Sequence, residues 1–110
     1  MLQRILEPEV MDSPAEARDY DSMDHAEVNW RFVEDFLAVV SKAEGKWQTA
    51  EVLKVLDLGT GTAQIPIELC RRSDRVAVVA VDAARNMLAV ATKNIAAAGL
   101  AARIDRKSVV

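Results

Sequence analysis

Residues 55–62 read VLDLGTGT, an apolar run that ends in an acid and a Gly-x-Gly turn. One helix-length segment later, residues 76–82 read VAVVAVD, a second apolar run that ends in an acid. Short, branched apolar runs favour buried parallel strands. A glycine turn between a strand and a helix leaves backbone N–H groups open to a ligand. The pattern therefore predicts half of a nucleotide-cofactor site at the carboxyl ends of two neighbouring strands.

Helix and strand signals extend this pattern in both directions along the chain. A serine followed by proline predicts a helix start at Ser13, and an acid predicts a second start at Asp24. The second helix is expected to end shortly before Gly45, which suits a left-handed cap. The remaining predicted elements are strands at 52–58, 76–81 and 104–110 and helices at 63–72 and 84–98. This order, two helices and then β-α-β-α-β, predicts an α/β fold with a parallel sheet.

Charge divides the chain into two parts of different character. Residues 1–37 hold ten acids against three bases, whereas residues 38–110 hold seven acids against eleven bases. The acidic part is explained either by a solvated face of the first helices or by an acidic lid over a cationic cofactor. We accordingly expect an N-terminal helical lid or arm over residues 1–46 and a partial cofactor-binding α/β domain over residues 47–110.

Several side chains are predicted to lie in the core. Helical spacing turns Trp30, Phe36 and Met87 inward. The nearly continuous apolar run at 76–81 predicts a strand that is covered on both faces. Cys70 lies within an apolar helix, so we expect a small buried hydrophobe and not a nucleophile.

Composition bounds the function. The chain has 110 residues, a net charge of −3 and 51% apolar residues, which describes one globular domain without a general basic field for nucleic acid. Its single cysteine predicts neither a disulfide framework nor a metal cluster. No apolar run approaches membrane length, and the first residues lack the apolar core of a secretory signal. We therefore expect a cytoplasmic protein that binds neither nucleic acid nor membrane.

Details of the turn distinguish between nucleotide cofactors. A dinucleotide fingerprint requires a third glycine at the position that Gln64 occupies. Asp57 would lie unfavourably close to a pyrophosphate, but an acid suits a cofactor that carries an ammonium group and no phosphate. A P-loop is excluded because no Gly-Lys-Ser/Thr follows. Charge thus favours S-adenosyl-L-methionine over NAD.

Residues 55–62 resemble the first signature of the class I S-adenosylmethionine-dependent methyltransferases. Residues 79–82, together with residues 87–88, are similar to the second signature, in the form common among ubiquinone/menaquinone-biosynthesis-like small-molecule enzymes. The resemblance implies a Rossmann-like methyltransferase fold, S-adenosyl-L-methionine as cofactor and a small-molecule methyl acceptor.

The resemblance also implies roles for the residues of the turn. Asp57 would hold the methionine ammonium group, directly or through water. Gly59 and Gly61, with Thr60 between them, would let the backbone approach the amino-acid part of the cofactor. A plainer interpretation of Asp57, that it merely caps a turn, stays open.

The second signature and the first helices supply the remaining candidates. Asp82 would accept hydrogen bonds from the ribose hydroxyls, and Ala83 and Met87 would flank the adenine. His25 and Asn29 are candidates for polar groups that close over the cofactor. Asp82 is alternatively the N-cap of the helix that follows it, and His25 is alternatively a solvated residue at a helix start.

The family fold has seven strands and about twice this length, so the resemblance covers only its N-terminal half and the sequence predicts an incomplete fold. No residue is identified as catalytic. The strand at 52–58 is expected to lack a neighbour on one side, and such an open edge favours self-association. Three functions are therefore weighed. They are the cofactor-binding half of a small-molecule methyltransferase, a non-catalytic fragment that pairs through its open edge with a partner chain, and an NAD-dependent oxidoreductase, which Gln64 disfavours.

Overall fold

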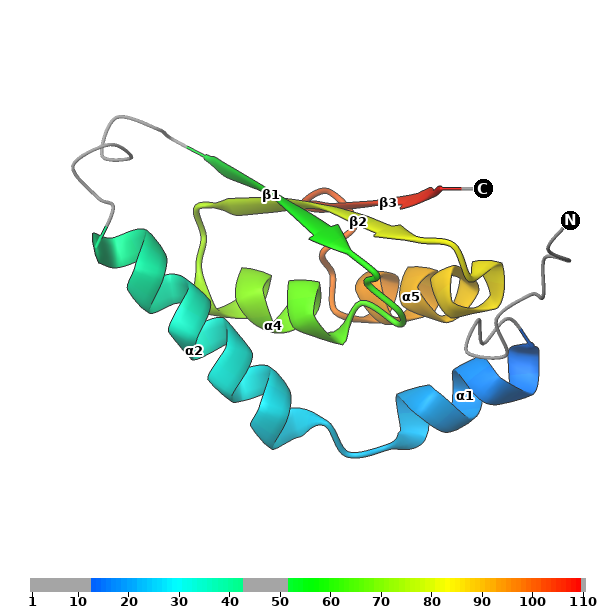
Figure 1. Ribbon diagram of the computed structural model, residues 1–110. Coiled ribbons are helices and arrows are strands. Elements are labelled where there is room, and N and C mark those ends of the chain that lie inside the picture. The colour runs from blue at the N-terminus through cyan, green and yellow to red at the C-terminus, as the bar shows by residue number, and fades with distance from the viewer. Residues whose placement is uncertain (1–12, 43–51, 110) are drawn as a thin grey trace, which may run out of the picture.

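A computed structural model describes residues 13–42 and 52–109 of the chain (Figure 1). The predicted cap at Gly45 lies outside these residues. The order of elements is α1 (Pro14–Ser22), α2 (Ala26–Lys42), β1 (Leu53–Leu58), α4 (Gln64–Arg72), β2 (Val76–Asp82), α5 (Arg85–Ala97) and β3 (Ile104–Ser108). The predicted α/β order is confirmed, with most elements shorter at their ends by one or two residues. Within the described ranges, no helix combines the length and apolar character needed to cross a membrane.

Local capping explains where the first two helices begin. The Ser13 hydroxyl accepts a hydrogen bond from the backbone N–H of Glu16 at 3.1 Å, which satisfies one free donor of α1. The Asp24 carboxylate accepts a bond from the backbone N–H of Ala26 at 3.0 Å, and α2 begins at that residue. Both helix starts expected from the sequence are thus confirmed.

The three strands form one parallel sheet in the order β1-β2-β3. The register aligns Leu56 with Val79, and Val79 with Asp105, so β2 lies between its neighbours. Within the part of the chain that the structure describes, β1 pairs with β2 alone. Its outer edge is unpaired within these residues.

The described helices all lie on one face of the sheet (Figure 1). α4 and α5 pack against the strands, with α2 against α4 and α1 against α5. The main core fills the space between the strands and these helices. Its buried members are Val33, Ala63, Ile67, Leu69, Cys70, Val76, Val78, Ala80, Ala91, Ile95, Leu100 and Ile104.

The expected cover on both faces of the strand at 76–81 is incomplete in the described residues, and β1 is exposed on one face. Leu56 is 61% exposed and Leu58 is 73% exposed, and Val79 between β1 and β3 is only half-buried. The physical reason is the one-sided helix layer. In β2 the side chains of Val76, Val78, Ala80 and Val81 are buried, whereas those of Ala77 and Val79 are only half-buried.

The core prediction fails for Trp30 and holds elsewhere. Trp30 is 50% exposed, and the Arg72 guanidinium lies 5.2 Å from its ring centroid and donates to its carbonyl at 3.3 Å. A cation–π contact at the surface therefore replaces the expected core packing. Phe36 packs against the core and Met87 is buried. Cys70 is buried as expected, and burial raises the pKa of its thiol more than nearby Arg103 lowers it.

Candidate cofactor site

The glycine turn after β1 is fastened to the end of β2 by backbone hydrogen bonds. The N–H groups of Gly59 and Thr60 both donate to the carbonyl of Val81, at 2.8 and 2.9 Å. Gly59 and Gly61 have positive φ angles of 72° and 59°, a backbone region that suits residues without a side chain. The turn therefore has one defined position at the carboxyl edge of the sheet.

Asp82 uses both oxygens of its carboxylate to hold neighbouring backbone. Oδ2 accepts from the N–H of Gly61 at 2.7 Å, and Oδ1 accepts from the N–H of Ala84 at 2.8 Å. The N-cap of α5 is Ala84, so the interpretation of Asp82 as the helix N-cap is wrong by two residues. A carboxylate oxygen has a second lone pair, so each oxygen keeps the capacity to accept a bond from a ligand hydroxyl.

Asp57 lies two residues before the turn and on the helix-covered face of β1. Partial burial raises the pKa of Asp57, the nearby Thr60 side chain lowers it, and the negative charge of Asp82 raises it further. Among residues 13–42 and 52–109, no ion pair is formed by either acid. Two neighbouring acids without a facing cation form a site whose charge fits a ligand with a positive group.

The two residues predicted to flank the adenine differ in exposure. Ala83 is exposed directly after Asp82. Met87 is buried in a small cluster with Ala17 of α1 and Ala84. Its side chain therefore serves the contact between α1 and α5, while Ala83 stays open at the edge of the sheet.

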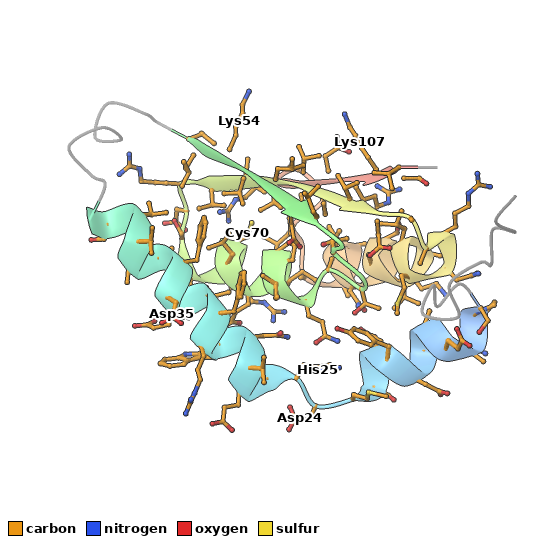
Figure 2. All side chains as sticks on the ribbon, viewed as in Figure 1. Asp24, His25, Asp35, Lys54, Cys70 and Lys107 are labelled. Atoms are coloured by element: carbon orange, nitrogen blue, oxygen red, sulfur yellow. The ribbon has the colours of Figure 1, made fainter. Side chains whose placement is uncertain are left out.

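His25 and Asn29, the two candidates from the N-terminal part, each contact a residue that lies against the turn or directly follows it. His25 lies at the connection between α1 and α2 (Figure 2). Its ring stacks on that of Tyr20, with 4.7 Å between the ring centroids. Nε2 of His25 is buried without a hydrogen-bond partner among the described residues. Tyr20 Cε1 lies 3.7 Å from the point where a Cβ on Gly61 would stand. Asn29 donates to the Gln64 side chain at 3.1 Å.

Sequence reasoning did not identify the polar group that joins these helices to the turn. The dinucleotide fingerprint identifies Gln64 only by the glycine it lacks, yet the Gln64 side chain bonds to Asn29 and to Asp21. Asn94 of α5 bonds to the same aspartate and to the carbonyl of Thr62. The signal in the sequence was a polar side chain at the first position of α4, but its partners lie too far along the chain to be inferred from spacing.

Comparison with known proteins identifies the family of this domain. A family model for a methyltransferase domain matches residues 55–109, which is half of the 110 residues. An uncharacterized methyltransferase of Emericella nidulans is 36% identical over 61 residues, which are 54% of this chain and 21% of that protein.

Solved structures share the fold. A proposed S-adenosyl-L-methionine-dependent methyltransferase of Methanococcus maripaludis aligns with a TM-score of 0.61 and 21% identity over 100% of this chain and 46% of its own. A proposed sarcosine dimethylglycine methyltransferase of Galdieria sulphuraria aligns with a TM-score of 0.56 and 22% identity over 73% of this chain and 27% of its own. This chain thus spans less than half the length of these proteins.

Proposed function

The chain belongs to the class I S-adenosylmethionine-dependent methyltransferases, and on this premise we propose that it forms the cofactor-binding half of an enzyme that methylates a small molecule. One observation supports the proposal above the others. Asp57 and Asp82 lie together at the carboxyl edge of the sheet without a facing cation among the described residues, beside a glycine turn with a fixed position. A cofactor with an ammonium and a sulfonium group matches that charge, whereas a pyrophosphate opposes it.

Each residue then has a role in binding. Asp57 attracts the ammonium group of the amino-acid part, and the side-chain-free turn at Gly59 and Gly61 admits that part to the backbone. Asp82 offers its remaining lone pairs to the ribose hydroxyls. The bound cofactor supplies an activated methyl group, and the contribution of the chain is to hold it in one orientation.

The acceptor and the cell compartment are further parts of the proposal. A small-molecule acceptor is supported by the form of the second signature, residues 79–82 with residues 87–88. A reducing cytoplasm is supported by the single, buried cysteine, Cys70.

Calorimetric titration tests the cofactor site. We expect the chain to bind S-adenosylhomocysteine and to give no heat with NAD. Asp82→Asn and Asp57→Asn should each weaken binding roughly 10- to 100-fold, as loss of a hydrogen bond to a charged group predicts. Asp105→Asn is the matched control, because it removes an acid that faces away from the site and pairs with Lys107 at 3.8 Å. A folded chain that binds NAD as tightly as S-adenosylhomocysteine would contradict the proposal.

A second function is favoured by the open edge of β1. Within the described ranges this strand has a neighbour on one side only, and Leu56 and Leu58 beside the edge are exposed. We propose as the alternative a non-catalytic role in which β1 pairs with a second copy of the chain. Sedimentation analysis over a range of concentrations tests it, and a monomer throughout would count against it.

A further inference from the structure

The side chain of Gln64 joins both N-terminal helices to the start of α4. Its Oε1 accepts a hydrogen bond from Asn29 of α2 at 3.1 Å. Its Nε2 donates to Oδ1 of Asp21 in α1 at 3.2 Å, and to the main-chain carbonyl of Asp21 at 3.4 Å. One carboxamide thus satisfies groups that lie 35 and 43 residues away in the sequence.

The same network reaches the glycine turn. Oδ1 of Asp21 also accepts from Nδ2 of Asn94 at 2.9 Å. That Nδ2 donates in addition to the main-chain carbonyl of Thr62 at 3.0 Å. The position of α1 is therefore tied through Asp21 both to the first residue of α4 and to the turn itself.

Apolar contacts alone hold α1 weakly. Ala17 is its one buried residue, in a small cluster with Ala84 and Met87. Tyr20 of this helix lies against Gly61, and the ring of His25 stacks on Tyr20. Tyr20 also packs against this small cluster, so apolar contact and the polar network together keep the two rings over the turn.

We propose that Gln64 is a positioning residue for the cofactor site. Its side chain holds α1 and α2 so that Tyr20, with His25 stacked on it, forms a wall over the glycine turn. The inference rests on the proposed function, because it concerns the same site. It assigns no contact between Gln64 and the cofactor. Loss of the network leaves the wall unformed in the free protein, and the cofactor must then order it at a cost in affinity.

An exchange of the amide and carboxylate groups between Gln64 and Asp21 tests this role, and the double variant keeps the net charge of the chain. Gln64→Glu places a carboxylate against Asp21 and removes the donor between α4 and α1. Asp21→Asn keeps an oxygen for Gln64 and Asn94, so it serves as the matched control. The double variant Asp21→Asn/Gln64→Glu restores one donor and one acceptor with their places reversed, and still leaves acceptors for Asn29 and Asn94.

Two measurements are made on all four proteins. Titration with S-adenosylhomocysteine should give a Kd about tenfold higher for Gln64→Glu, and a Kd within about threefold of the unsubstituted chain for the control and the double variant. Hydrogen exchange without ligand should be faster at the amides of α1 in Gln64→Glu alone. The amides of β2 should be unchanged in all four, which separates positioning from loss of the fold.

The double variant distinguishes a positioning role of Gln64 from a merely structural one. Restoration of both affinity and exchange in the double variant supports the inference. A double variant as weak as Gln64→Glu overturns it, and so does a single variant that loosens α1 while its Kd stays unchanged. Absence of binding by the unsubstituted, folded chain instead removes the proposed function, and the positioning role falls with it whatever the exchange data give.

Discussion

The two faces of the sheet are built from the same three strands but differ in what they contact. The helix-covered face carries the core and both acids of the site, since Asp57 and Asp82 follow the alternation of buried residues along β1 and β2. The opposite face carries exposed Leu56 and Leu58 beside charged Lys54 and Lys107, which point away from the described helices (Figure 2). Alternation along each strand thus concentrates packing and chemistry on one side, and leaves the other without a partner in the described residues.

The largest difference between the faces should appear in stability. Ile104 on the covered face is only 2% exposed. The variant Ile104→Ala should therefore lose about 2–4 kcal/mol of unfolding free energy, because the missing side chain leaves a cavity. Leu58→Ala on the bare face should cost less than about 1 kcal/mol, since that side chain is largely in water already. Urea unfolding of both variants measures the two values. Equal losses would mean that the bare face is covered in solution.

A smaller effect is expected at the edge between the faces, where Asp82 holds the turn. Asp82→Ala leaves the N–H groups of Gly61 and Ala84 without their acceptor, which should cost about 1–3 kcal/mol. Asp82→Asn keeps one oxygen and should retain part of that stability. Thermal unfolding without ligand compares them, and indistinguishable variants would show that the carboxylate does not hold the turn.

Substitution of Asp57 should change the free energy of unfolding in the opposite direction, toward greater stability. Burial raises its pKa above the ordinary value, so charging the folded protein costs free energy as the pH rises through the folded pKa. Asp57→Asn should therefore be slightly more stable than the unsubstituted chain at neutral pH, and this gain should disappear in acid below the ordinary carboxyl pKa. Melting curves from neutral to acidic pH check the sign. A loss of stability at neutral pH would contradict it.

The smallest effect on stability is expected on the bare face. Leu56→Lys should change the free energy of unfolding by no more than about 0.5 kcal/mol, because an exposed side chain is replaced by a soluble one. If β1 pairs with a second copy, the same variant should shift the sedimentation profile toward monomer. Unchanged self-association would move the contact away from this strand.

Local signals predicted most of the fold. Caps at Ser13 and Asp24 fixed two helix starts, and the strand–turn–helix pattern brought Asp57 and Asp82 to one edge of a parallel sheet. These features depend on neighbours within a few residues, or on a pairing that parallel strands impose.

Tertiary features were beyond the same reasoning. Apolar residues at every position of 76–81 indicate a strand able to be covered twice, but not whether a helix lies on each face. Helical spacing predicts that Trp30 faces inward, but it does not indicate that the side chain lies at the surface, where the Arg72 guanidinium packs on its ring. The Gln64 network was missed because its partners are distant in sequence and are joined only by the final packing.

The carbonyl of Val81 accepts two backbone hydrogen bonds from the glycine turn, and this has a consequence for folding. Gly59 and Thr60 follow β1, whereas the carbonyl that binds both belongs to β2, beyond an intervening helix. The turn therefore takes its shape only after a non-local pairing has closed. Its two amides should exchange with solvent as slowly as those of the paired strands, although Gly59 itself is exposed. Their exchange rates thus report the opening of the whole β1–α4–β2 unit.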